Sequence, residues 1–88
     1  MKNSEDRKNV QTLHVIKANY LPATETRGSR ISLKSEIYTS RKVIDYNYKL
    51  NGTLDIAKEY LLKNGFNLIG EAEGKNCYYI ITDTFKEF

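Results

Sequence analysis

The chain has few of the residues on which metal sites and disulfides depend. It contains one cysteine, one histidine and one proline among its 88 residues, and no tryptophan. Cys77 cannot form a disulfide within the chain, which points to a reducing, cytoplasmic compartment, and its apolar neighbours predict a small core residue. One cysteine and one histidine cannot supply the roughly four ligands of a zinc site. We therefore expect neither a metal nor a cofactor.

Catalytic motifs, membrane spans and secretion signals are also missing from the sequence. No apolar run approaches the roughly 20 residues of a membrane-spanning helix, and the N-terminus lacks the charged-then-apolar pattern of a signal peptide. The segment Arg27–Arg30 holds one glycine and does not lead into a helix, so it is not a nucleotide-binding P-loop. His14 has no nucleophile beside it in the sequence, which favours a structural or surface role, and Ser29 has no identifiable base. We predict a cytoplasmic protein that is not an enzyme and does not contact membranes.

The charge is mildly basic and unevenly placed. The net charge is +3. Residues 17–49 carry seven basic and three acidic side chains, or +4, whereas residues 50–88 carry four basic and six acidic ones, or −2. The positive field therefore belongs to the first half of the fold and favours an anionic partner. A mixed, solvated surface is the alternative explanation.

The length allows one small domain. Residues 1–9 have no apolar residue after Met1, so we expect a disordered tail there and a single small α+β domain over residues 10–88. Apolar–polar alternation predicts strands, and apolar residues at three- and four-residue spacing predict a helix over 53–64. The predicted strands lie near residues 13–21, 30–38, 41–50, 66–73 and 77–85. The order β-β-β-α-β-β predicts a mainly antiparallel sheet with one amphipathic helix packed on one face.

Individual residues predict where elements end and which strands are interior. Thr53 is expected to cap the helix, and Gly65 to take the left-handed conformation just past its end. A turn is expected at Gly74-Lys75, and Gly28 stands at a turn position compatible with a positive φ. The first strand has apolar residues on both faces, which predicts a central strand or a bulge midway, and the last is a continuous apolar run, which predicts an interior strand.

Seven tyrosines are a second unusual feature. On an open sheet face tyrosines stack on unpaired bases, and at protein interfaces they are rigid anchors. Tyr46 and Tyr48 share the parity of Ile44, so we expect both in the core. Tyr78 and Tyr79 must point to opposite faces, so at most one lies beneath the helix. A wholly structural role for the tyrosines is the alternative.

The segment LPATETRGSR, residues 21–30, is the part of the chain that folding explains least. Pro22 ends the first strand, and no periodicity follows it. Arg27 and Arg30 can hold a phosphate or carboxylate in a bidentate fork, and neighbouring hydroxyls add donors. In the structural alternative, the hydroxyls cap the loop's own backbone and the arginines pair with acids such as Asp45. The predicted partner-binding residues, from this loop and the basic hairpin after it, are Thr24, Thr26, Arg27, Ser29, Arg30, Lys34, Arg41 and Lys42.

The run YLPATETRGSR at residues 20–30 resembles the signature of a group of small bacterial proteins found on phages, plasmids and chromosomes. In that signature a Tyr–apolar–Gly/Pro–Pro/Ala–Thr–x–Thr–x–Gly–Ser–Arg run follows the first strand. VIDYNY at 43–48 is similar to the group's "vtiPYdy" segment before a helix, with Asp45 where proline is usual, and residues 65–82 resemble its closing hairpin. The resemblance implies a single small module that mobile elements often carry, and it transfers no function.

Two functions are compatible with these features. The first is a non-enzymatic nucleic-acid-binding module of phage or mobile-element type, whose loop and basic hairpin contact phosphates. The second is a protein-binding inhibitor of a host defence system, of the anti-restriction or anti-CRISPR type, with tyrosine and arginine at its interface. The partner is then a nucleic acid or a host protein, and the chain is a monomer or an edge-strand homodimer.

Overall fold

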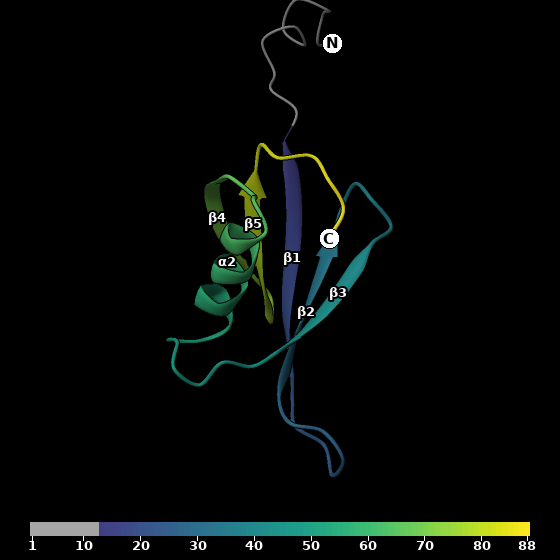
Figure 1. The fold of residues 1–88 in the computed structure, drawn as a ribbon, viewed down its shortest axis with the longest axis vertical. Coiled ribbons are helices and arrows are strands. Elements are labelled where there is room, and N and C mark those ends of the chain that lie inside the picture. The colour runs from purple at the N-terminus through teal and green to yellow at the C-terminus, as the bar shows by residue number, and fades with distance from the viewer. Residues whose placement is uncertain (1–12) are drawn as a thin grey trace, which may run out of the picture.

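An antiparallel sheet of five strands carries one helix on one of its faces (Figure 1). The computed structural model describes residues 13–88, so the predicted tail at residues 1–9 lies outside the described residues. The elements are β1 (His14–Leu21), β2 (Arg30–Ser35), β3 (Arg41–Asp45), α2 (Thr53–Lys63), β4 (Leu68–Gly74) and β5 (Cys77–Thr82). The predicted α+β fold and the order β-β-β-α-β-β are confirmed.

The first and last strands of the chain are neighbours in the middle of the sheet. The strand order is β3-β2-β1-β5-β4, and each neighbouring pair is antiparallel. In this arrangement Ala18 of β1 stands between Leu33 of β2 and Tyr78 of β5. Interior positions satisfy the backbone N–H and C=O groups of β1 and β5 on both sides. The prediction that both strands are interior is confirmed.

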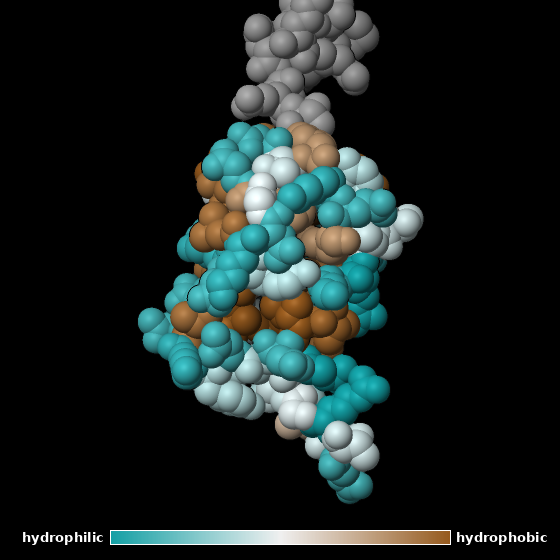
Figure 2. All heavy atoms as spheres, viewed as in Figure 1, coloured by the Kyte–Doolittle hydropathy of each residue, from teal (hydrophilic) through white to brown (hydrophobic). Residues whose placement is uncertain are grey.

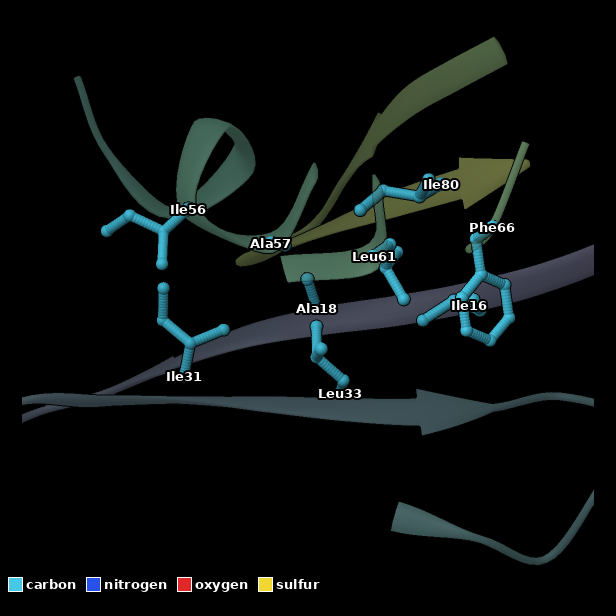
Figure 3. Close-up of a cluster of buried hydrophobic side chains, with 9 residues drawn as sticks. All are labelled: Ile16, Ala18, Ile31, Leu33, Ile56, Ala57, Leu61, Phe66 and Ile80. Carbon is cyan, nitrogen blue, oxygen red and sulfur yellow. The ribbon is translucent and has the colours of Figure 1, made fainter. Parts of the chain in front are cut away.

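The core lies between the sheet and α2, and it is built from one parity of each strand. Ile16 and Ala18 of β1 point to the same side as Leu33 of β2 and Ile80 of β5, because successive side chains of a strand alternate. The apolar face of the helix packs against these side chains, as Figure 3 shows. Each fully buried Ile or Leu contributes about 1.5–3 kcal/mol relative to an exposed one. The buried cluster comprises Ile16, Ala18, Ile31, Leu33, Ile56, Ala57, Leu61, Phe66 and Ile80.

The C-terminal segment after β5 returns across the helix side of the sheet. Figure 1 shows this segment, in yellow, crossing from β5 over β1 toward β2. The Phe85 ring stacks on His14 at a centroid distance of 5.7 Å. The Phe88 ring lies 6.1 Å from that of Phe66. The segment therefore extends the core past the last strand and covers the start of β1.

The ends of α2 and the position of the last turn differ in part from the predicted ones. Gly65 has φ 85, as predicted for the left-handed residue beyond the helix. The N-cap is Gly52, at φ 127, and no side chain caps the helix, so the predicted Thr53 cap is wrong. The last turn is Lys75-Asn76, one residue later than predicted. Gly52 takes a conformation that favours glycine just before the helix, and Thr53 is the first residue of α2.

The alternation predicted for residues 41–50 stops early. Strand β3 ends at Asp45, and beyond it parity no longer determines burial. Tyr46 packs against the core, but Tyr48 is 77% exposed, so its predicted core position is wrong. Tyr78 packs against the core beneath the helix and Tyr79 lies on the opposite side of β5, which confirms their expected separation. None of the described helices is long and apolar enough to cross a membrane.

Candidate functional site

Three cations lie side by side on the face of the sheet opposite α2, which we call the open face. Lys17 of β1 stands opposite Lys34 of β2, and Lys34 stands opposite Arg41 of β3. Lys17 and Lys34 point away from the core because their neighbours Ala18 and Leu33 point into it. Within residues 13–88, no acidic group comes within ion-pair distance of any of the three cations. Like charges at opposed positions destabilise a sheet, so this row is costly unless an anion neutralises it.

A polar hollow of about 480 Å³ opens around this row. Its floor is formed by the outward side chains of Ser32 and Lys34 on β2, which share one face, and by Glu36, which directly follows the end of β2. Ser32 is only 4% exposed, and its Oγ accepts a hydrogen bond of 2.9 Å from Arg41 Nε. This bond holds the guanidinium at the hollow and leaves its two terminal nitrogens directed to other partners. The lining residues are Lys17, Asn19, Ser32, Lys34, Glu36, Thr39 and Arg41.

Tyr79 of β5 stands opposite Lys17, so its phenol lies next to the row of cations. The neighbouring Cys77, through a side-chain hydrogen bond and then through its charge, raises the pKa of the Tyr79 phenol, and burial and the Glu36 carboxylate add smaller effects in the same direction. The phenol therefore stays neutral at physiological pH. Gly74 leaves room for the ring, because a Cβ at that position would lie 2.6 Å from it. Cys77 is buried, as predicted, but on the side of the sheet away from the helix-side cluster.

The predicted loop forms a protruding arm, residues 22–29, between β1 and β2 (Figure 1). Figure 2 shows that its tip is mostly hydrophilic. At the tip the Thr24 Oγ1 accepts the Arg27 backbone N–H at 3.2 Å, and the Thr24 N–H donates to the Arg27 carbonyl at 2.8 Å. Thr26 and the side chain of Arg27 are exposed. The φ of Gly28 lies outside the left-handed region, so the positive φ considered for it is absent.

Ser29 stabilises the base of the arm. It is buried, and its Oγ lies 2.8 Å from the Tyr20 hydroxyl. Its carbonyl accepts a 3.1 Å hydrogen bond from the backbone N–H of Tyr46. Thr24 thus caps the arm's own backbone, as the structural alternative expected, whereas the Ser29 hydroxyl contacts the side chain of Tyr20 in β1.

The predicted basic residues from Arg30 onward are divided between the two faces of the sheet. Arg30, Lys34 and Arg41 lie on the open face. Lys42 stands opposite Leu33, so it lies on the helix side, away from the other three. The Nε of Arg30 is buried and has no hydrogen-bond partner within the described part of the chain. Arg30 is the first residue of β2 and stands opposite Asp45 of β3.

Sequence reasoning missed several lining residues of the hollow. Lys17 and Asn19 are the polar, outward-facing positions of β1, and Ser32 is their counterpart on β2. The alternation against Ile16 and Ala18 could have shown that Lys17 and Asn19 point away from the core. The strand register that places Lys17 beside Lys34 is a tertiary property, so only the structure brings the three cations together.

The single histidine belongs to a second polar cluster, on the helix side. His14 Nδ1 lies 2.9 Å from the Thr84 carbonyl, which can only accept, so Nδ1 carries the proton. His14 Nε2 then accepts from the Ser35 hydroxyl at 2.6 Å. The Ser35 Oγ also accepts the backbone N–H of Tyr38 at 2.9 Å. His14 and Ser35 are 0% and 2% exposed, so this pair joins β1, β2 and the C-terminal segment and has a structural role.

No group of three or more histidine, cysteine or acidic residues that could hold a metal occurs between residues 13 and 88. Comparison of the chain with known protein families, curated proteins and solved structures finds no match.

Proposed function

We propose that the protein is a non-enzymatic module that binds nucleic acid across the open face of its sheet. The observation that supports this most directly is the row of Lys17, Lys34 and Arg41 on three neighbouring strands. Opposed like charges cost a sheet stability, of the order of tenths of a kcal/mol per pair. A polyanion removes that cost and gains free energy from the release of its counterions.

The arm extends the same basic surface. Arg30 points to the open face beside the hollow, and Arg27 is exposed at the arm's tip. A flexible chain of phosphates can follow the cations from Arg41 to Arg27. Contacts of this kind position a nucleic acid without reading its bases, so we expect weak sequence preference. The phage or mobile-element origin is part of this proposal and is supported by the motif at residues 20–30.

A protein partner is the second candidate, and an aromatic cluster at the base of the arm favours it. The Tyr20 and Tyr46 rings meet edge to face at a centroid distance of 5.6 Å, and the Tyr46 and Tyr48 rings are 4.8 Å apart. Tyr20 is 46% exposed and Tyr48 77% exposed. Exposed tyrosines of this kind are typical anchors of protein interfaces. An inhibitor of a host defence protein would use this cluster.

The deciding experiment is a fluorescence-anisotropy titration with labelled single- and double-stranded DNA and RNA at low and physiological salt. The test variant is Lys17→Gln plus Lys34→Gln. The control variant is Lys63→Gln plus Lys75→Gln, which removes the same charge from the helix end and the β4–β5 turn. We expect the test pair to weaken binding at least tenfold and to lower the salt slope by about 1.4, at about 0.7 per phosphate contact on a single strand.

Two outcomes would reject the proposed site or the proposed function. Equal weakening by both pairs would mean that only net charge matters and would reject the open face. Absence of binding at low salt would reject the nucleic-acid function. Affinity capture of a partner that Tyr48→Ala abolishes would then support the protein-binding candidate.

A further inference from the structure

The hollow on the open face has the features of a site for one compact anion. A groove for a long backbone needs only exposed cations, yet here Ser32 is 4% exposed and holds Arg41 through the 2.9 Å bond to its Nε. The Ser32 hydroxyl keeps its own hydrogen free to donate. Arg41 keeps its terminal N–H groups, which form a planar fork suited to phosphate oxygens. Arg41 is therefore positioned before a ligand arrives.

The local charge matches a phosphomonoester better than a phosphodiester. The lining carries three cations and one carboxylate, Glu36, for a net charge of +2. A phosphomonoester carries about −1.5 to −2 at neutral pH, whereas each phosphodiester of a nucleic-acid backbone carries −1. A terminal phosphate therefore neutralises the lining, and an internal one leaves part of the repulsion between Lys17 and Lys34.

Glu36 limits the hollow to a single phosphate. It lines the hollow two residues after Lys34, directly beyond the end of β2 at Ser35. A second phosphate placed along β2 would meet this carboxylate and be repelled. A sugar hydroxyl or the amino group of a base could instead donate to it. Thr39 adds one more hydroxyl at this side.

From this geometry we infer that the hollow binds a phosphomonoester, the terminal phosphate of a nucleic-acid strand or of a nucleotide. This rests on the proposed function in assigning the phosphate to a strand end. The arm then contacts the following backbone, and the protein prefers ends to continuous strands. Lys17, Lys34 and the Arg41 fork hold the phosphate oxygens, and Ser32 donates to one of them.

The test compares two labelled single strands of the same sequence, one with a 5′-phosphate and one with a 5′-hydroxyl, in wild type and variants. A 3′-phosphorylated strand, adenosine monophosphate and inorganic phosphate are the further probes, followed by amide NMR shifts. We expect the 5′-phosphorylated strand to bind at least tenfold more tightly. Arg41→Lys keeps the charge but removes the fork, so it should abolish this preference and leave the two strands with equal affinity. Arg27→Lys at the arm's tip is the matched control and should retain the preference.

The outcomes separate this inference from the proposed function. Equal binding of the two strands, with adenosine monophosphate leaving Ser32 and Asn19 unshifted, overturns the inference and leaves nucleic-acid binding intact. Binding of adenosine monophosphate or phosphate at Ser32 without binding of either strand supports the phosphate site and rejects the nucleic-acid function. A preference that survives Arg41→Lys overturns the inferred site, and Ser32→Ala repeats that test with no change of charge.

Discussion

Arg41 and Lys42 are neighbours in the chain but serve opposite faces of the sheet. Arg41 stands in the row with Lys34 and donates to Ser32, whereas Lys42 lies opposite Leu33 on the helix side. We therefore expect Arg41→Gln to weaken nucleic-acid binding at least fivefold and Lys42→Gln less than twofold. Anisotropy titrations at one low salt concentration would measure this, and both variants lose the same charge. A larger effect of Lys42→Gln would place the binding surface on the helix side.

We expect the side chains of Ser35 and Ser40 to contribute differently to the stability of the folded protein. The Ser35 hydroxyl satisfies the buried His14 Nε2 and the Tyr38 N–H, while the Ser40 Oγ is buried without a partner among the described residues. Leaving a buried acceptor unsatisfied costs about 1–3 kcal/mol. In thermal unfolding, Ser35→Ala should lower Tm by at least about 4 °C, at roughly 4–8 °C per kcal/mol for a domain of this size. Ser40→Ala should leave Tm unchanged or raise it, and a larger loss there than at Ser35 would contradict this account.

At the scale of elements, Gly52 at the start of α2 and Gly28 in the arm differ in backbone conformation, so we expect their substitution to affect stability differently. Gly52 enters α2 at φ 127, where a side chain is strained, whereas a Cβ at Gly28 meets nothing within 4 Å. We expect Gly52→Ala to destabilise the protein by about 1 kcal/mol or more. Gly28→Ala should be neutral or stabilising by up to about 1 kcal/mol. Denaturant unfolding measures both, and a destabilising Gly28→Ala would mean that the arm is part of the cooperative unit.

The predicted elements are confirmed where local pattern and tertiary packing agree. Ile31 and Leu33 alternate with polar residues and are buried under α2, and Gly65 ends the helix in the left-handed conformation. Tyr48 was misplaced because the strand ended before the alternation did. The predicted Thr53 cap is wrong because the helix begins one residue earlier than predicted, and the capping residue is the one just before its first residue.

At the scale of the whole molecule, the sheet gathers cations that are far apart in the sequence. Lys17, Lys34 and Arg41 lie on three strands, β2 also carries Arg30, and the arm adds Arg27. Three to five phosphate contacts predict a salt slope of about −2 to −3.5 for a single strand. Raising the salt from 50 to 200 mM should then weaken binding about 20- to 130-fold. A plot of the logarithm of the association constant against log salt concentration measures the slope, and a slope near zero would show that binding does not depend on phosphate contacts.

The sequence by itself determined the kind and order of the elements and the buried faces of β2 and β3. These follow from local patterns, since alternation and helical spacing show which residues leave water. It also identified Arg30, Lys34 and Arg41 as candidates, although it grouped them with Lys42 and with the hydroxyls of the arm. Only the tertiary structure decided that Lys17 joins them. Register depends on pairing between strands distant in the chain, and a shift of one residue would turn Lys17 into the core.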